Sequence, residues 1–372
     1  MSGRIEQIAL AGPLPPPFGG MANQTRQLAE LLRASGIGVQ LIRSNSPYRP
    51  AWAGRIRGLR ALFRLFPYLT AAWRGLGKVQ LVHLMANSGW SWHLFAAPII
   101  WLAQIRNVPV IVNYRGGEAE AFLKKQIHWL RPTLRRVDQL VVPSGFLKEV
   151  FARFGIDAEV VPNIIDLDHF SGGKKERPVS DAPHLVVCRN LELIYDVETA
   201  IRAFSLVHRH YPAAKLTIAG EGPERAALEQ LADSLQIKSS VTFSGRLDRD
   251  EMVTLYRSAD LMLNSSQVDN MPNALLESMS AGVPVVTTDA GGIPHMVRDG
   301  ISALVRPVGD YEGMAQAAIE LLSDHDRYRQ LVHNAREEVS RYRWESVKPQ
   351  WLALYTRTID GRLATESRKQ AE

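Results

Sequence analysis

The chain has 372 residues and a formal net charge of +6, with 46% hydrophobic and 22% charged residues. This length predicts two domains that each bury a core, and the composition excludes disordered and collagen-like chains. The single cysteine, Cys188, excludes a disulfide framework and cysteine-rich zinc sites, and it fits a reducing compartment. We therefore expect a cytoplasmic protein. The opening segment MSGRIEQIALAG indicates a buried strand, because its apolar run is too short for a signal peptide.

One stretch is long enough to raise the question of a membrane span. Residues 79–105 carry no formal charge, and about 20 apolar residues suffice to cross a bilayer. The stretch also contains histidines, amides, serines and Pro98, and it divides into VQLVHLM and WHLFAAPIIWLAQI. A strand followed by a buried helix is therefore the better prediction.

Charge is distributed unevenly along the chain. Residues 1–170 hold 20 Lys and Arg against 10 Asp and Glu, and no acidic residue lies between Glu30 and Glu118. Within that interval, residues 49–78 interleave arginines with aromatic and aliphatic residues at helical spacing, which predicts a basic amphipathic helix. Such a helix favours an anionic membrane surface, as on the inner face of the plasma membrane. The alternative is an ordinary helix with a solvated basic face; no recognition motif supports nucleic acid as a partner.

Short β-branched segments alternate with amphipathic helices along the chain. This pattern predicts parallel sheets with right-handed crossovers, and hence an α/β fold. The segment SGGKKERPVSDAP has no apolar period and is typical of a linker. The predicted domains are 1–168 and 184–343, with a linker at 169–183 and a helix with a polar tail at 344–372 that we expect to cross back to the first domain. The predicted strands are 5–12, 38–44, 79–85, 109–116, 139–144, 159–163, 184–190, 214–220, 240–245, 260–266, 283–289 and 302–307.

The segment VDNMPNALLESMSAGVPVVTTDAGGIP carries the strongest candidate site. Ligands of doubly wound sheets bind outside the carboxyl ends of the strands, and Asp269 directly follows a predicted strand. Pro272 suits the first turn of a helix, so free N–H groups near Asn273 would present the positive end of the helix dipole to a phosphate. Glu277 lies one to two turns inside that helix and can accept hydrogen bonds from the hydroxyls of a ribose. A capped helix with two solvated acids is the alternative.

The same segment resembles the signature of the family 4 retaining glycosyltransferases, in which an acid is followed, after seven residues, by a Glu: here Asp269 and Glu277. The resemblance extends to PPPFGGMANQTRQLAELL, VVPSGFLKEVFARFGIDAEVVPNIIDLDHF, KLTIAGEGPERAAL and VTFSGRLDRDEMVTLYRSADLMLNSS, and so covers roughly residues 10–350. It implies the GT-B fold, two Rossmann-like doubly wound domains with an interdomain cleft and a C-terminal helix after the second sheet. The first domain would be the acceptor side and the second would bind the nucleotide sugar.

The resemblance also implies roles for individual residues. Glu277 would bind the ribose, Asp269 the hydroxyls of the donor sugar, and Arg189 the diphosphate leaving group, a role that suits a bidentate arginine. Arg115 occupies the position of a first-domain histidine and could reach a phosphate or a sugar hydroxyl. The remaining expected donor contacts are the glycine loops and the start of the helix: Gly19, Gly20, Gly220, Gly222, Asn270, Met271, Pro272 and Asn273.

Three positions depart from the family pattern. Asp269 stands where a Glu is usual, so the contact to the sugar shifts or the sugar differs. Leu193, Ile194 and Tyr195 occupy the region of a lysine that normally follows the phosphate arginine. Arg115, in YRGGEAE, replaces the histidine of a His-Gly pair, so no imidazole can act there.

The resulting hypothesis is a retaining hexosyltransferase of cell-envelope polysaccharide biosynthesis. It would move a sugar from a UDP- or GDP-linked donor to a glycan or lipid-linked acceptor, with no metal and no cofactor. The alternative is a non-catalytic sugar-nucleotide-binding or membrane-docked assembly subunit. A nicotinamide-dependent oxidoreductase is disfavoured, because AGPLPPPFGG lacks the Gly-x-Gly-x-x-Gly pattern. We interpret His83 as a core or cleft-wall residue, and Asp166 and Asp168 as part of the connection between domains.

Overall fold

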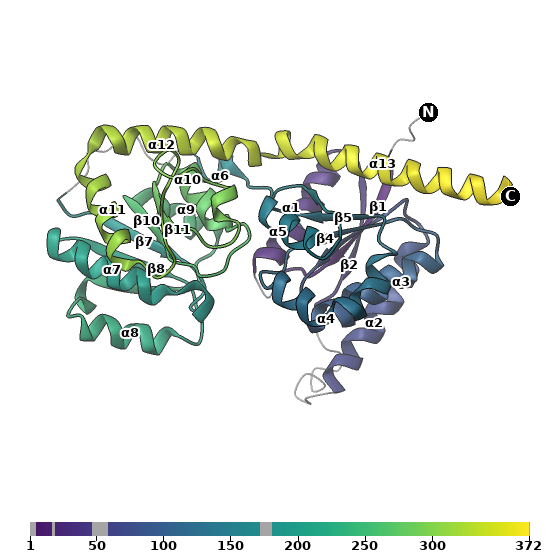
Figure 1. The fold of residues 1–372 in the computed structure, drawn as a ribbon, viewed down its shortest axis with the longest axis horizontal. Helices are drawn as coiled ribbons and strands as arrows, with labels where there is room; N and C mark the ends of the chain where they lie inside the picture. Colours follow the sequence, from purple (N-terminus) through teal and green to yellow (C-terminus); the bar gives the residue numbers. More distant parts are fainter. Residues whose placement is uncertain (1–4, 17–18, 47–58, 172–180, 372) are drawn as a thin grey trace. The chain divides into compact units, whose positions relative to one another are not determined.

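The computed structural model describes residues 5–16, 19–46, 59–171 and 181–371, with side chains described from residue 63 in the third range and up to residue 364 in the last (Figure 1). The chain divides into two compact units. Unit 1 contains Met1–Ile164 and Trp344–Glu372, and unit 2 contains Ile165–Arg343. Each unit is an α/β/α sandwich around a parallel sheet, as the alternating pattern of the sequence predicts.

Unit 1 has six parallel strands in the order β2-β1-β3-β4-β5-β6. Their bounds are β1 Gln7–Gly12, β2 Gly38–Arg43, β3 Val82–Ala86, β4 Val110–Tyr114, β5 Gln139–Val142 and β6 Glu159–Val160. β3, β4 and most of β5 are fully buried, because helices cover both faces of the sheet.

The two faces of this sheet have separate apolar cores. One core joins Ala9 and Val82 to helices α2 (Leu59–Leu76), α3 (Ala97–Ile105), α4 (Ala119–Leu134) and α5 (Gly145–Ala152). The other joins Ile8 and Leu10 to α1 (Gly20–Ala34) and to Trp351 of α13 (Trp344–Ala371). A π-helical turn, Trp92–Ala96, leads into α3. The stretch 79–105 is therefore a strand followed by a helix, and within the described residues no helix is both long and apolar enough to span a bilayer.

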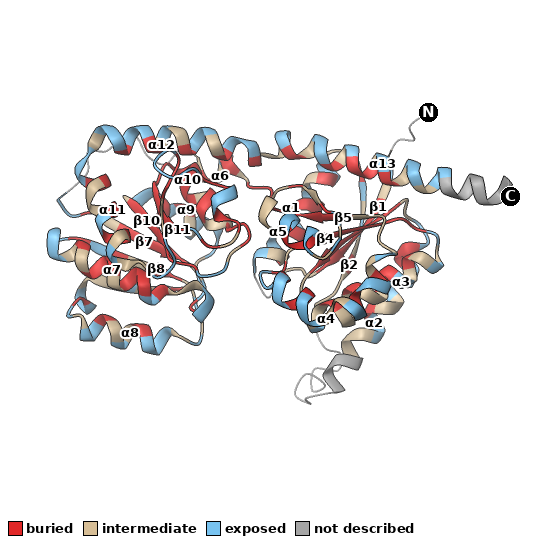
Figure 2. Cartoon of the chain, in the orientation of Figure 1, coloured by how far each residue is buried: buried red, intermediate tan, exposed pale blue. Residues whose placement is uncertain are grey.

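Unit 2 has six parallel strands in the order β12-β11-β10-β7-β8-β9. Their bounds are β7 His184–Cys188, β8 Lys215–Ala219, β9 Val241–Gly245, β10 Leu261–Asn264, β11 Val285–Thr288 and β12 Leu304–Arg306. One face packs against α7 (Val197–His210), α8 (Arg225–Ser234) and α11 (Tyr311–Ser323). The other packs against α6 (Leu167–Phe170), α9 (Arg249–Ser258), α10 (Asn273–Ala281) and α12 (His325–Val339). Figure 2 shows the buried strands between half-exposed helices.

Eleven of the twelve strands lie within the segments that the sequence predicts as strands, and β3 extends one residue beyond its segment, to Ala86. This agreement confirms the doubly wound α/β class. The boundary between the units falls after Ile164, whereas the sequence places the end of the first domain at residue 168. The difference arises because Leu167 and Phe170 are buried in the core of unit 2, and Ser280 of α10 donates a hydrogen bond to the Leu167 carbonyl at 3.0 Å. Asp166 caps α6 and forms an ion pair with Arg249, which fits a connecting role.

Candidate functional site

The strand order of unit 2 locates a candidate site. β7 is the first strand of this sheet and lies between β8 and β10, so the chain leaves β7 toward one edge and later returns to its other side. The carboxyl ends of β7 and β10 therefore flank the topological switch point, where doubly wound sheets bind their ligands. Arg189 directly follows β7, and Asn264 ends β10.

Arg189, Asp269 and Asn264 meet at this point. The guanidinium donates from Nη2 to Asp269 Oδ2 at 2.6 Å and from Nε to Asn264 Oδ1 at 2.8 Å. The side chains of Arg189 and Asp269 are only 12% and 13% exposed. Asn264 is fully buried and donates in turn to Thr287 at 2.9 Å, which ties the pair to β11. A buried arginine held by two neighbouring loops is preorganised to face an anion.

The electrostatic balance of this pair is set by burial. Burial raises the pKa of the Asp269 carboxyl, while the Arg189 guanidinium and the N–H groups of Asn270 and Met271 oppose that rise. An ion pair taken out of water holds its two charges only when such hydrogen bonds accompany it. We therefore take Asp269 as ionised when Arg189 is beside it, so that the ligand-free pair has no net charge.

The segment Leu193–Tyr195, where the family pattern has a lysine, packs beside Arg189. The guanidinium carbon of Arg189 lies 5.2 Å from the centre of the Tyr195 ring. Ser265, next to Asn264, donates to the Tyr195 carbonyl at 3.2 Å, and the Gln267 N–H donates to the Ile194 carbonyl at 2.9 Å. An aromatic face thus supports the guanidinium where the family pattern places a second cation.

Glu277 lies on α10, eight residues after Asp269. Tyr256 of α9 donates to its Oε2 at 3.4 Å and to the Ala274 carbonyl at 3.2 Å. Burial raises the pKa of Glu277 to about 7, and the bond from Tyr256 opposes that rise. This partly buried environment penalises the charge of Glu277 until a partner satisfies the carboxylate, which favours a ligand contact over a solvated acid.

The start of α10 differs slightly from the sequence prediction. Pro272 precedes the helix as its N-cap, with an extended backbone, and Asn273 is the first helical residue. The Leu275 N–H donates to the Pro272 carbonyl at 3.3 Å, so this amide is already used within the turn. Asn270 and Met271 are 6% exposed. The positive end of the α10 dipole lies at Asn273, and its contact with an anion remains a prediction.

Two glycine pairs shape the loops around Arg189 and Asp269. A Cβ on Gly220 would lie 1.8 Å from the Arg189 carbonyl oxygen, and one on Gly222 would lie 2.2 Å from that of Leu191. These glycines let one loop pack on the backbone beside Arg189, which accounts for them without a ligand; a donor contact by either remains a prediction. Gly291 and Gly292 do the same for the Asp269 loop, where a Cβ would lie 2.2 Å and 1.9 Å from carbonyl oxygens of that loop.

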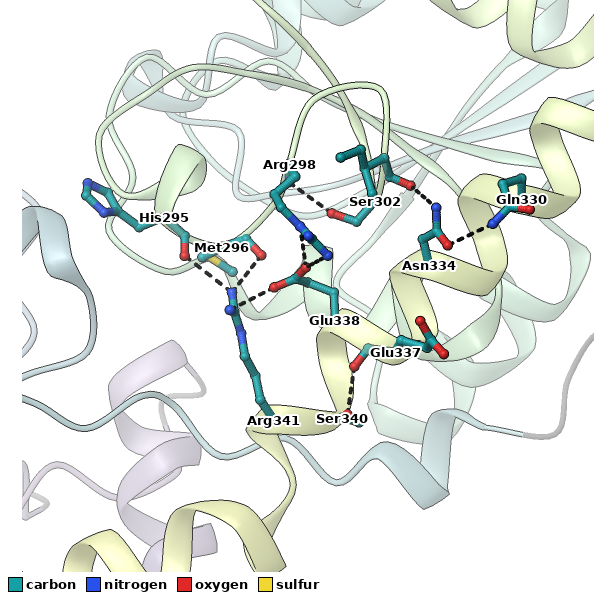
Figure 3. A network of polar contacts seen from close by, with 11 residues as sticks. His295, Met296, Arg298, Ser302, Gln330, Asn334, Glu337, Glu338, Ser340 and Arg341 are labelled. Carbon is teal, nitrogen blue, oxygen red and sulfur yellow. Dashed lines mark hydrogen bonds and ion pairs between the residues drawn. The ribbon is translucent and has the colours of Figure 1, made fainter.

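A buried carboxylate holds the segment that follows Gly292 (Figure 3). Glu338 of α12 is 8% exposed and accepts from Arg298 at 2.9 Å and from Arg341 at 2.7 Å. Arg341 also donates to the carbonyls of His295 and Met296 at 3.3 and 3.0 Å. Since the Gly292 N–H donates to the Asp269 carbonyl at 2.8 Å, the network supports the Asp269 loop from behind.

Unit 1 contains the other predicted residues. Arg115 follows β4 and donates to Asn163, and burial lowers its pKa to about 10. Gly19 caps α1 with an extended backbone and Gly20 is its first residue; a Cβ on either would meet no atom within 4 Å. Arg115 and these glycines belong to unit 1 and the residues around Arg189 to unit 2, so their part in donor binding remains a prediction.

His83 is a core residue, as predicted, but it belongs to a buried polar chain. Tyr355 of α13 lies 2.7 Å from His83 Nδ1, and the Asn113 amide lies 3.0 Å from Nε2. Burial, with a smaller contribution from Arg115, lowers the pKa of His83 to about 3, so the ring is neutral. These buried polar contacts connect α13 with β3 and β4.

Two further predictions, the basic helix at 49–78 and the absence of a metal site, can be compared only with the described residues. Of the basic helix predicted at 49–78, residues 49–58 lie outside them, and α2 covers most of the rest. Among the side chains that the structure describes, no three His, Cys, Asp or Glu residues gather as metal ligands would.

Comparison with known proteins agrees with this geometry. A family model described as "Glycosyltransferase Family 4" matches residues 18–169, and one described as "Glycosyl transferases group 1" matches residues 173–338. The chain belongs to the family 4 glycosyltransferases. Its two six-stranded units have the GT-B fold of this family.

Individual relatives of this glycosyltransferase family differ in how much of the chain they match. N-acetyl-alpha-D-glucosaminyl L-malate synthase of Bacillus anthracis is 33% identical over 184 residues, or 49% of this chain and 48% of that protein. Phosphatidyl-myo-inositol mannosyltransferase of Mycolicibacterium smegmatis is 24% identical over 92% of this chain and 91% of its own. The solved sucrose-phosphate synthase of Thermosynechococcus elongatus, 20% identical, has a TM-score of 0.76 over 96% of this chain and all of that one. The first similarity thus spans about half of that relative.

The sequence of this glycosyltransferase predicts the charged residues of the site but not the residues that form hydrogen bonds and ion pairs around them. Asn264, Tyr256 and Glu338 were not singled out, because a polar side chain inside an apolar pattern gives no sign of its partner. Gly291 and Gly292 could have been found, since paired glycines after a predicted strand mark a close backbone approach.

Proposed function

We propose that the protein is an enzyme that transfers a sugar, with retention of configuration, from a nucleotide-diphosphate sugar to a lipid-linked or membrane-proximal glycan acceptor. Membership of the glycosyltransferase family supports the transfer reaction. The observation that carries the proposal is the largely buried Arg189–Asp269 pair at the switch point of unit 2, with the partly buried Glu277 eight residues after Asp269.

Arg189 stabilises the diphosphate leaving group in this proposal. Arginine has five N–H donors, of which one is bound to Asp269 and one to Asn264, so others can reach a phosphate. The N-terminus of α10 adds the positive end of its dipole. Stabilising the departing charge in a preorganised site is the largest catalytic contribution that this arrangement can make. The acceptor hydroxyl would attack from the face of the departing phosphate, which takes the proton, without a metal or a cofactor.

The two acids have separate roles. Asp269 binds a hydroxyl of the donor sugar while it holds Arg189, and Glu277 accepts hydrogen bonds from the ribose hydroxyls. A carboxylate that is buried and only weakly satisfied, as Glu277 is, gains most when two hydroxyls donate to it. UDP- and GDP-linked sugars are the expected donors.

The charge of the first 170 residues and one relative support a membrane-linked acceptor. The first 170 residues carry the basic excess of the chain, which suits an anionic lipid surface, and the relative that matches 92% of the chain is named for a phosphatidyl-myo-inositol acceptor. We infer work at the cytoplasmic side of a membrane, in the assembly of a cell-envelope glycan.

The test begins with nucleotides. UDP, GDP, ADP and CMP are compared by thermal shift, and the sugar donors of the stabilising base are then assayed for transfer, with the anomeric configuration of the product read by NMR and activity repeated with EDTA. Arg189→Lys should lose most transfer, whereas Arg202→Lys, in an exposed pair with Glu198, should keep it. An inverted product, loss of activity with EDTA, or full activity of Arg189→Lys would each contradict part of the proposal.

A second candidate function is a non-catalytic sugar-nucleotide-binding subunit. Two departures favour it: no lysine stands in the region of Leu193, Ile194 and Tyr195, and Arg115 replaces a histidine. Each loses a group that the family pattern supplies. Calorimetry that detects donor binding, together with a donor that is never consumed in the presence of any acceptor fraction, would support this alternative.

A further inference from the structure

Large apolar side chains are exposed on one layer of unit 1. Helices α2, α3 and α4 lie side by side over one face of its sheet (Figure 1), and their outer side exposes three tryptophans, a phenylalanine and an isoleucine. These are Phe66 (73%), Trp73 (44%), Trp101 (41%), Ile105 (67%) and Trp129 (83%). Side chains of this size are rarely left in water in such numbers unless the surface binds something.

The tryptophans are joined into one surface by arginines and a hydrogen bond. The Arg106 guanidinium lies 3.9 Å above the Trp73 ring, and that of Arg136 lies 3.7 Å above the Trp101 ring. Ile105 precedes Arg106 and is one helical turn from Trp101. Trp101 donates to Thr133 of α4 at 3.2 Å, one turn beyond Trp129. We call these five apolar residues, with Arg106 and Arg136, the aromatic-basic surface.

The surroundings of this surface are cationic. Neither α2 nor α3 contains an acidic residue. The one acid within α4, Glu120, is at its far end and forms an ion pair with Arg153. Exposed Arg74 on α2, Lys78 just after α2 and Lys125 on α4 add positive charge.

We infer that the aromatic-basic surface docks on an anionic lipid bilayer. Tryptophan is amphipathic and favours the headgroup level of a bilayer, where its ring is half apolar and its N–H meets polar groups. Guanidinium groups stacked on these rings lose little hydration and can donate to lipid phosphates. A neutral protein partner would not need the excess of cations, and a second copy of this surface would repel it.

The inference rests on the proposed membrane-proximal function and gives it a surface made of described residues. It differs from the amphipathic helix predicted at 49–78, because α3 and α4 supply most of the apolar contact. The surface is also separate from the Arg189 site in unit 2, so lipid binding can be tested without any nucleotide.

The experiment measures co-sedimentation of the full chain with phosphatidylcholine vesicles, with and without phosphatidylglycerol, at low and high salt. Binding should require the anionic lipid and weaken with salt. Arg106→Gln and Arg136→Gln should each weaken it about five-fold, and Phe66→Ser with Trp129→Ser should weaken it further. The matched controls Arg33→Gln on α1 and Leu363→Ser on α13, exposed on the opposite face, should leave it unchanged.

Nucleotide calorimetry and sedimentation velocity separate the outcomes. Unchanged nucleotide binding in all variants shows that unit 2 is intact. Loss of vesicle binding in the surface variants, but not in the two controls, then supports the inference. Equal binding to neutral and anionic vesicles, no vesicle binding, or equal loss in the controls overturns it, even where transfer activity stands. Self-association that the Trp129→Ser variant abolishes would instead identify a second copy as the occupant and would also overturn it.

Discussion

The Arg189 guanidinium donates to the Asp269 carboxylate over 2.6 Å, so the cation proposed for the diphosphate is held by an anion before any donor arrives. Both side chains are nearly buried, and the pair is close to neutral as a unit. A diphosphate must therefore share Arg189 with Asp269. Asp269, shorter than the usual Glu, holds this pair at the switch point. A mutation of Asp269 can therefore change nucleotide binding and sugar transfer in different directions.

Asp269→Asn should tighten binding of the nucleotide diphosphate and reduce transfer. The amide keeps the size of the side chain and can accept from Arg189, but it removes the negative charge that competes with phosphate. Removing one unit charge near a partly buried site is worth about 1–3 kcal/mol, so we expect roughly five- to hundred-fold tighter binding by calorimetry. Glu198→Gln, in an exposed ion pair, is the control. Weaker nucleotide binding by Asp269→Asn would show that the carboxylate contacts the nucleotide directly.

Nucleotide binding should depend on pH through Glu277. The pKa of this carboxyl is raised to about 7, so it is mostly protonated at pH 6 and mostly ionised at pH 8. Ribose hydroxyls donate to the ionised form, so affinity should rise as pH increases through about 7 and level off above it. Glu277→Gln should flatten this dependence. Inorganic diphosphate has no ribose, so its binding should show the same pH dependence in the wild type and in the variant. A pH dependence that survives in Glu277→Gln would assign it to another group.

Ionisation of Glu277 should lower the stability of the ligand-free protein as pH rises, whereas it should raise the affinity for nucleotide. A folded-state pKa above the ordinary value of 4.5 means that the native state binds more protons than the unfolded state between about pH 4.5 and 7, so this group lowers stability as pH rises across that window. Glu277→Gln should therefore unfold at a higher temperature than the wild type at pH 8, and the difference should vanish near pH 4.5. Calorimetric unfolding at both values measures it; a lower Tm of the variant at pH 8 would contradict a buried, poorly satisfied carboxylate.

The sequence was sufficient for the twelve strands and for the charged residues of unit 2, because strand periodicity is local and because Asp269 and Glu277 lie in one continuous segment. It was not sufficient for the partners of those residues. Asn264 and Tyr256 approach Arg189 and Glu277 only through strand order, which brings β10 beside β7. The Glu338 network is 69 residues away along the chain from Asp269, and an acid in a charged helix is ordinarily solvated. Long-range packing decided that it is buried.

Glu338→Ala should raise the KM for the donor more than it lowers kcat. Without the carboxylate, Arg341 loses the partner that fixes it beneath the carbonyls of His295 and Met296, and the Asp269 loop loses support through Gly292. The cost of leaving Arg298 and Arg341 unpaired is limited because their side chains are 65% and 49% exposed. Glu337→Ala changes an exposed neighbour on the same helix and should behave as wild type, and Glu338→Asp should recover part of the loss. Equal effects of Glu337→Ala and Glu338→Ala would mean that only helix stability matters.

Gly292→Ala should abolish donor binding while the chain stays folded. The new Cβ would lie 1.9 Å from the Asn270 carbonyl oxygen, a distance that only a shift of the loop can relieve, and that loop carries both Asp269 and the start of α10. Gly292 is buried and directly precedes the core residue Ile293, so the variant is interpreted only if its fold is shown to be retained. Gly361→Ala on α13 places a methyl group in open space and is the matched control. Circular dichroism reports the fold and calorimetry the nucleotide affinity. If Gly292→Ala binds nucleotide as tightly as Gly361→Ala does, the position of the Asp269 loop does not determine donor binding, and the role proposed for Asp269 fails with it.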